Sequence, residues 1–129
     1  MIGCSIGLAL VPEHGMRVDE ILRNADLALY RSKNAGRSCF HLYSAELKAE
    51  ADQRNVLEIE LREAIWRDEM EVFYQPVIEL CTGRVKSVEA LARWHHRTRG
   101  YIPPAEFIAV AEAGGLIVEL GNQVLARAC

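Results

Sequence analysis

One short run, Glu89 to Trp94, restricts the fold of this chain more than any other segment, because two kinds of residue alternate along it. Side chains alternate across a strand and rise about 3.3 Å per residue. In a strand, Glu89, Leu91 and Arg93 therefore share one face. Ala90, Ala92 and Trp94 share the other face. The run predicts a strand with one face that can hold a metal and a phosphate and one face that can pack.

The length of 129 residues allows about one small domain, and is too short for two complete ones. Hydrophobic residues at 50% and charged residues at 26% indicate an ordinary globular protein, and no apolar run reaches the roughly 18 residues that span a bilayer. We therefore expect no membrane contact by this segment. The net charge of -3 gives no reason to expect binding to a nucleic acid polymer.

Five basic residues are crowded into the short segment 93–99. A basic cluster, which we interpret as a solvated loop, comprises Arg93, His95, His96, Arg97 and Arg99. We expect neither histidine to bind metal.

The four cysteines are widely spaced and form no CxxC pair. This predicts reduced, buried thiols of a cytoplasmic protein rather than a zinc site. The cysteines are Cys4, Cys39, Cys81 and Cys129.

The N-terminal third predicts a strand, a helix and a second strand. Met1 to Val11 is an apolar run closed by a turn, which is typical of a buried strand. A helix should begin at Val18, with Asp19 as its N-cap and Gly36 as its C-terminal stop. Its apolar stripe is Val18, Ile21, Leu22, Ala25, Leu29 and Ser32. Cys39 to Tyr43 alternates as a short strand.

A charged amphipathic helix is predicted from Ala45 to Asp68, with its apolar residues at Leu57, Leu61, Ala64 and Ile65. Residues 46–55 are nearly free of large apolar side chains. This suits a connector between two domains, so we place a domain boundary near residues 45–55.

The C-terminal half predicts an antiparallel hairpin and two helices. Met70 to Leu80 and Arg84 to Trp94 are strand-like and are joined by a short turn. Pro76 favours an edge or irregular position for the first strand. Helices should follow Pro103 and span the run from Ile117. Because both ends fall inside predicted elements, we expect the chain to be a piece of a longer protein.

At this point two groups of motifs resemble known families. Ser5-Ile6-Gly7, the run from Arg23 to Lys33, and Gly36-Arg37 resemble the closing third of a GGDEF domain, the diguanylate cyclase family. The resemblance implies that Lys33 and Arg37 contact nucleotide phosphates, although a solvated helix end would also explain this pair. Ser38 stands where the family usually has Asn. The GGDEF signature itself is absent, so we expect no cyclase activity from this chain.

The second group resembles the opening third of an EAL domain, the family of cyclic di-GMP phosphodiesterases. It comprises Tyr74-Gln75-Pro76, Glu89-Ala90-Leu91-Ala92-Arg93-Trp94 and Pro103-Pro104-Ala105-Glu106-Phe107-Ile108. The resemblance implies that Glu89 binds metal, Arg93 contacts a phosphate of cyclic di-GMP, and Gln75 and Leu91 line the nucleotide site. Alternatively, Glu89 and Arg93 pair with each other or fill a barrel interior.

The predicted fold class is α/β, with a cyclase-like end piece (residues 1–44), a linker helix (45–68) and the first elements of an EAL TIM-like barrel (69–129). Both domains would be incomplete, because a TIM-type barrel takes roughly 250 residues. The resemblance implies a parent protein that hydrolyses cyclic di-GMP to pGpG with Mg or Mn, and an isolated chain without catalysis, since one Glu cannot hold two ions. Two alternatives stay open: a receptor that binds cyclic di-GMP without cleaving it, and an interaction module that forms a homodimer through the EAL part or the linker helix.

Overall fold

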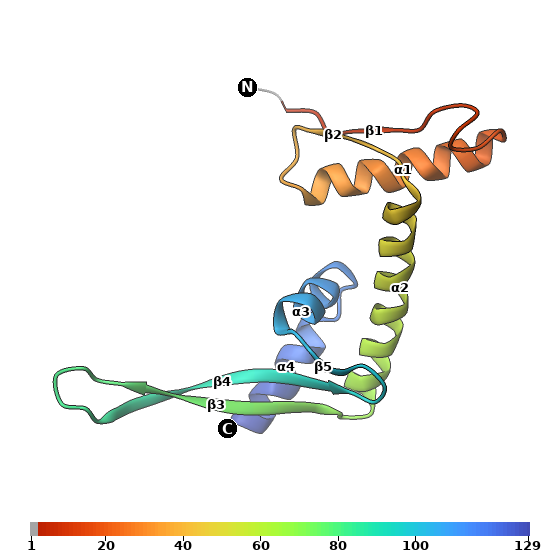
Figure 1. Cartoon of the computed structure of the whole chain (residues 1–129). Helices are drawn as coiled ribbons and strands as arrows, with labels where there is room; N and C mark the ends of the chain where they lie inside the picture. Colours follow the sequence, from red (N-terminus) through yellow and green to blue (C-terminus); the bar gives the residue numbers. More distant parts are fainter. Residues whose placement is uncertain (1–2) are drawn as a thin grey trace. The chain divides into compact units, whose positions relative to one another are not determined.

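The computed structural model describes residues 3–129, which form two compact units, residues 3–55 and residues 56–129. Each unit mixes helices and strands (Figure 1). The elements are β1 (Ile6–Leu8), α1 (Val18–Asn34), β2 (Phe40–Leu42), α2 (Ala45–Trp66), β3 (Met70–Ile78), β4 (Val85–His96), β5 (Gly100–Ile102), α3 (Pro104–Ala113) and α4 (Ile117–Ala128). No helix among residues 3–129 is long and apolar enough to cross a membrane.

In the first unit, β1 and β2 pair in parallel, with Ile6 opposite Phe40, and α1 connects them and packs on the pair (Figure 1). Gly7 permits this close approach, because a Cβ there would collide with backbone atoms of Ala25 and Leu29. The Ser32 hydroxyl donates a hydrogen bond to the Ile6 carbonyl over 2.8 Å. The predicted strand, helix and strand are therefore present, although residues 1–2 of the first prediction lie outside the described residues.

The structure corrects three details of this unit. The strand from Met1 to Val11 was predicted as buried, but Ile6 and Leu8 are exposed, because α1 covers one face of a sheet of only two strands. The buried face of α1 is Asn24, Ala28 and Ser32, while Val18 and Leu22 of the predicted stripe are exposed.

Asp19 is also not the N-cap of α1. Arg17 occupies that position without a side-chain bond to the helix. Asp19 lies in the first turn, where it pairs instead with Arg17 at 3.1 Å and with Arg23 at 3.9 Å. The predicted stop at Gly36 is confirmed: its φ is 103°, and the Arg37 N–H bonds to the Ser32 carbonyl at 3.1 Å, as in a Schellman motif.

In the second unit, β3, β4 and β5 form an antiparallel sheet in that order. The core residues come from the second half of α2, from the sheet and from α3 and α4; they are Leu57, Leu61, Ala64, Ile65, Met70, Trp94, Ile102, Phe107, Val110, Ala111, Leu116 and Leu120. The apolar residues predicted for the linker helix are all in this set. Trp94 is 1% exposed and meets the ring of Phe107 edge to face, with centroids 6.1 Å apart.

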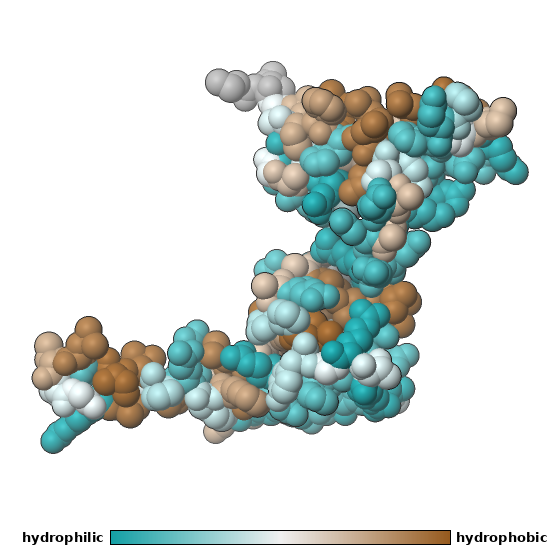
Figure 2. All heavy atoms as spheres, in the orientation of Figure 1, coloured by the Kyte–Doolittle hydropathy of each residue, from teal (hydrophilic) through white to brown (hydrophobic). Residues whose placement is uncertain are grey.

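The hairpin of β3 and β4 confirms the predicted strand pair, with β3 at the sheet edge as Pro76 indicated. Its far end carries exposed apolar side chains, which appear as a brown group in Figure 2, and Leu80 there is 95% exposed. The short strand β5 was not predicted, because the basic residues that precede it favour a solvated loop. The helix predicted from Ala45 to Asp68 is α2, which ends at Trp66 because Asp68 has a φ of 57°.

The expectation of buried thiols is wrong. Cys4, Cys81 and Cys129 are exposed and Cys39 is half-buried. Cys4 precedes β1, Cys81 lies in the hairpin turn and Cys129 is the last residue, so none of the three occupies a core position of a helix or strand.

Candidate nucleotide and metal site on strands β3 and β4

The register of the hairpin brings the predicted EAL residues onto one face of the sheet. Gln75 of β3 lies directly opposite Glu89 of β4, and Phe73 lies opposite Leu91. Directly opposed residues of an antiparallel pair project to the same face, and so do residues two apart on one strand. Gln75, Glu89, Leu91 and Arg93 therefore share one face, which we call the EAL face.

The other face of the same strands is the packing face. Trp94 is buried and Ala92 packs against the core. From β3, the Tyr74 hydroxyl donates to the Arg127 carbonyl of α4 over 3.0 Å. This division agrees with the alternation of residues 89–94, and on the EAL face Gln75 and Glu89 are exposed while Leu91 and Arg93 are half-buried.

Glu89 is exposed, and among residues 3–129 its carboxylate has no hydrogen-bond or ion-pair partner. It does not pair with Arg93, which is half-buried and four residues further along the strand. A carboxylate oxygen is the ligand type that Mg²⁺ and Mn²⁺ prefer, so Glu89 fits the metal role as one ligand. Residues 3–129 contain no cluster of three or more acidic, His or Cys side chains that could hold a metal.

Arg93 is positioned by two contacts. One guanidinium nitrogen donates to the Ala92 carbonyl at 2.9 Å. The guanidinium carbon lies 5.6 Å from the centre of the Phe73 ring, within the range of a cation–π contact. Phe73 was not among the predicted site residues, although its alternation with Gln75 on β3 placed it on the same face.

The basic cluster is only in part the solvated loop that we expected, because Arg97 and Arg99 lie in an exposed turn whereas Arg93, His95 and His96 belong to β4. It covers the end of β4 and the turn into β5, and three of its five residues lie within ion-pair distance of acids of α2 and the segment after it. The Glu60 carboxylate forms an ion pair with Arg99 at 3.1 Å and lies 3.4 Å from His96, and Arg97 pairs with Glu69. These acids lie about 30 to 40 residues away in sequence, so local pattern did not reveal them.

In the first unit, Lys33 lies in the last turn of α1 and Arg37 follows the end of this helix, and both side chains are exposed. Neither side chain has an ion-pair partner among residues 3–129. A helix C-terminus favours cations, which accounts for the placement of Lys33 without reference to a ligand.

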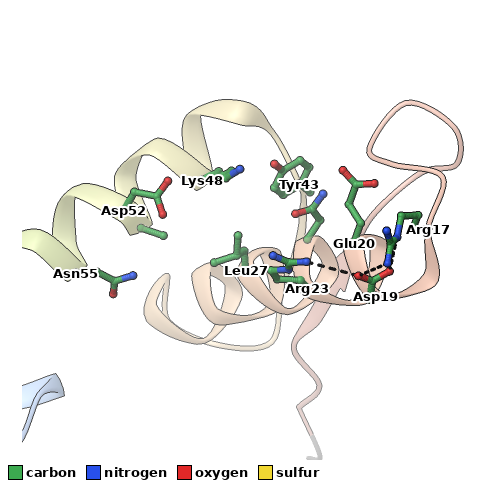
Figure 3. Close-up of a pocket in the computed structure, with 11 residues that line it drawn as sticks. Arg17, Asp19, Glu20, Arg23, Leu27, Tyr43, Lys48, Asp52 and Asn55 are labelled. Atoms are coloured by element: carbon green, nitrogen blue, oxygen red, sulfur yellow. Dashed lines mark hydrogen bonds and ion pairs between the residues drawn. The ribbon is translucent and has the colours of Figure 1, made fainter.

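A separate hollow of about 540 Å³ in this unit does not include Lys33 or Arg37. Its charged side chains are three basic and three acidic, namely Arg17, Arg23, Lys48, Asp19, Glu20 and Asp52. Figure 3 shows Arg17 and Arg23 both turned toward Asp19, with which they pair. The balance of charge gives this hollow no preference for an anion such as a phosphate.

Comparison with known families assigns both halves of the chain. Residues 58–129 match the EAL domain family. The chain belongs to the EAL family. Its residues 1–39 match the diguanylate cyclase GGDEF domain, so the chain has the tandem GGDEF–EAL arrangement that its motifs resemble. The EAL match includes Gln75, Glu89, Leu91 and Arg93, and the GGDEF match includes Lys33 and Arg37.

Curated relatives extend this similarity over nearly the whole chain. It is 44% identical over 125 residues to the cyclic di-GMP phosphodiesterase NbdA of Pseudomonas aeruginosa, covering 97% of the chain and 16% of that protein. It is 43% identical over 122 residues to the cyclic di-GMP phosphodiesterase PdeR of Escherichia coli, covering 95% of the chain and 18% of the relative. The chain thus spans less than a fifth of the length of these two EAL proteins.

Solved EAL structures share the fold. The PaMucR phosphodiesterase in complex with c-di-GMP matches with a TM-score of 0.53 at 42% identity, over 57% of this chain and 30% of that one. An EAL enzyme with cAMP and cyclic di-GMP bound matches with a TM-score of 0.58 at 25% identity, over 89% of this chain and 28% of that one. The mixed α/β fold of the chain is thus part of the TIM-like EAL fold.

Proposed function

We propose that this chain is part of a metal-dependent phosphodiesterase that hydrolyses cyclic di-GMP to pGpG. The observation that carries the proposal is the hairpin register, which places Gln75 opposite Glu89 on the face that also holds Leu91 and Arg93. The phosphodiesterase names of the relatives point to the same reaction. We assign residues 1–44 to the GGDEF part, 45–68 to the linker helix and 69–129 to the EAL part of a cytoplasmic protein.

Each residue of the EAL face has a distinct part in this reaction. Glu89 would hold Mg²⁺ or Mn²⁺, which in such sites supplies activated water and stabilises the charge that develops on phosphate oxygens. The guanidinium of Arg93 would orient a phosphate through its free N–H donors. Gln75 and Leu91 would line the nucleotide, one by hydrogen bonding and the other by apolar contact.

The test compares the full-length protein that carries this segment with its Glu89→Gln variant in cyclic di-GMP hydrolysis. Removing a metal ligand should abolish metal-dependent turnover, whereas Leu91→Ala should mainly weaken nucleotide binding. Glu112→Gln, which removes an exposed carboxylate from α3, is the control and should leave turnover unchanged. Equal turnover by wild type and Glu89→Gln would remove Glu89 from the metal site.

The chain by itself should not hydrolyse cyclic di-GMP, because Glu89 is a single carboxylate and two ions need several. Hydrolysis by the isolated chain, retained after removal of contaminating enzyme, would contradict this. Binding of cyclic di-GMP by the full-length protein in Mg²⁺ without turnover would instead favour the receptor alternative.

In the GGDEF part, we propose that Lys33 and Arg37 contact nucleotide phosphates, since both are exposed and unpaired among residues 3–129. Lys33→Ala and Arg37→Ala should each weaken GTP binding by the full-length protein, measured by isothermal titration calorimetry. Arg31→Ala is the control, because Arg31 pairs with Glu50 at 3.6 Å. GTP binding unchanged in both test variants would leave the pair as a solvated helix end.

A homodimer through the linker helix is a separate proposal. Val56, Ile59 and Trp66 lie on one side of α2, away from its buried residues, and Trp66 is 83% exposed. An exposed apolar row of this kind is typical of helix pairing. Light scattering should give a mass that rises with concentration, and Ile59→Glu should abolish the rise. A concentration-independent monomer mass would refute the homodimer.

A further inference from the structure

Three aromatic rings lie on the EAL face on either side of Arg93, with Phe73 opposite Leu91 and with His95 opposite Tyr101. Phe73 of β3 and Tyr101 of β5 meet edge to face, with ring centroids 6.4 Å apart and an interplanar angle of 76°. Tyr101 also meets His95 of β4, at 5.0 Å and 87°. The three strands of the sheet thus each contribute one ring to a connected group, the ring cluster of Phe73, His95 and Tyr101.

The ring cluster contacts the site through Arg93. The guanidinium of Arg93 lies over the Phe73 ring at 5.6 Å, and only one of its nitrogens is engaged in a hydrogen bond, to the Ala92 carbonyl. Glu71 is directly opposite Arg93 in the register, yet Arg93 forms no ion pair with it or with any other residue of 3–129.

The nature of this contact matters for a residue that must bind phosphate. A carboxylate partner would occupy the N–H donors of the guanidinium and neutralise its charge. An aromatic face holds the guanidinium plane while leaving its edge donors and its charge available to an anion. A side chain held in its bound geometry also loses less conformational entropy on binding.

We propose that Phe73, supported by Tyr101 from β5, is a positioning residue that holds the guanidinium of Arg93 ready for a substrate phosphate. This inference rests on the proposed function for the role of Arg93, but the contact itself can be tested without activity. It also assigns a purpose to β5, whose Tyr101 contacts the Phe73 ring edge to face across β4, the middle strand of the sheet.

The first experiment is kinetic and uses the full-length protein. Phe73→Leu removes the ring and keeps an apolar side chain of similar size, so KM for cyclic di-GMP should rise about three- to tenfold with kcat little changed. Phe73→Tyr keeps the ring face and should restore the wild-type KM. Tyr101→Leu, which leaves Phe73 in place, should produce a smaller rise in KM.

The second experiment uses this chain in solution and needs no substrate. The Phe73 ring current should shift the Arg93 δ-proton resonances upfield, and the shift should be lost in Phe73→Leu and kept in Phe73→Tyr. Unchanged amide spectra of α3 and α4 would show that the Leu variant is folded. If Phe73→Leu does not fold, Tyr101→Leu decides, because the upfield shift should then decrease.

The two experiments separate the failure of this inference from the failure of the proposed function. An inactive wild-type protein that retains the Arg93 signature would refute the phosphodiesterase proposal only. The positioning role would be overturned if the wild-type protein is active and Phe73→Leu has the same KM and the same Arg93 resonances as the wild type.

Discussion

Asp68 is one of three non-glycine residues with a positive φ among residues 3–129, the others being Arg37 and Ser38. Its φ of 57° ends α2, because the N–H groups of Asp68 and Glu69 turn back to bond the Ile65 and Ala64 carbonyls at 3.1 and 2.9 Å. Its side chain pairs with Arg127 of α4 at 2.8 Å. One residue therefore both terminates α2 and joins the end of α2 to α4.

We predict that Asp68→Ala lowers the free energy of unfolding of the chain by about 1–2 kcal/mol. The left-handed conformation costs an alanine about 1–2 kcal/mol, and loss of an exposed ion pair adds only a few tenths. Urea denaturation measures the change. Asp68→Asn is the control, since Asn tolerates this conformation and loses only the charge. Equal losses in both variants would show that the ion pair, not the backbone conformation, dominates.

Ser44, immediately before α2, acts on the charge of the first helical turn. Its hydroxyl accepts the Leu47 N–H at 3.4 Å, and its hydrogen bond to the Glu46 carboxylate holds the pKa of Glu46 below its ordinary value. A lowered pKa means that the stabilisation is present above the ordinary pKa of the carboxyl and is lost as pH falls through the lowered value.

We therefore predict that Ser44→Ala raises the pKa of Glu46 toward that of an unperturbed glutamate. An NMR titration of the Glu46 side-chain carboxyl carbon between about pH 2 and 7 would measure it. Glu50, also near the start of α2, serves as an internal control because it is too far along the helix to contact Ser44. An unaltered Glu46 titration would assign its lowered pKa to the helix backbone instead.

At the scale of elements, His96 links β4, the following turn and α2. Its Nδ1 accepts the backbone N–H groups of Thr98 and Arg99, both at 3.2 Å, while its Nε2 lies 3.4 Å from Glu60. A ring nitrogen that accepts carries no proton, so the proton of the neutral ring lies on Nε2 and faces Glu60. The short strand β5 begins directly after this turn.

We predict that His96→Phe destabilises the chain by about 1–3 kcal/mol, because it removes the buried ring nitrogen that accepts two backbone N–H groups of the turn. Hydrogen exchange of the Thr98 and Arg99 amides should accelerate more than that of the core residue Trp94. His95→Phe is the matched control, since the exposed His95 ring bonds neither amide. Unchanged exchange at both amides in His96→Phe would contradict the capping role.

At the scale of the whole molecule, the apolar core belongs to one unit. Every residue of the core cluster lies between Leu57 and Leu120, and β1, α1 and β2 pack by themselves around Gly7, Ala28 and Ser32. The buried residues of α2 all lie in its second half, after residues 46–55, which carry few large apolar side chains.

We predict that the two units respond to separate substitutions. Phe107→Ala should lower the stability of residues 56–129 by about 3–5 kcal/mol, because it empties a fully buried ring site. Gly7→Ala should disrupt residues 3–55, since its Cβ collides with the α1 backbone. Amide exchange at Ser32 and Trp94 reports each unit. Loss of protection at both positions in either variant would show one cooperative unit.

Residue spacing along the chain was sufficient to predict many of the helices and strands and several of their buried faces. Alternation from Glu89 to Trp94 predicted the strand and its two faces, and the helical period of Leu57, Leu61, Ala64 and Ile65 predicted the buried side of α2. These features depend on the geometry of a single strand or helix, so neighbouring residues specify them. The family motifs likewise lie in short contiguous runs.

The remaining features depend on contacts between distant residues. The tertiary structure alone placed Phe73 beneath Arg93, Tyr101 against Phe73, and Glu60 beside His96 and Arg99. It also decided that Ala28 rather than Leu22 faces the strands, because Gly7 brings the α1 backbone close at that point. Such choices follow from which surfaces meet in space, and the periodicity of either partner alone does not specify the other.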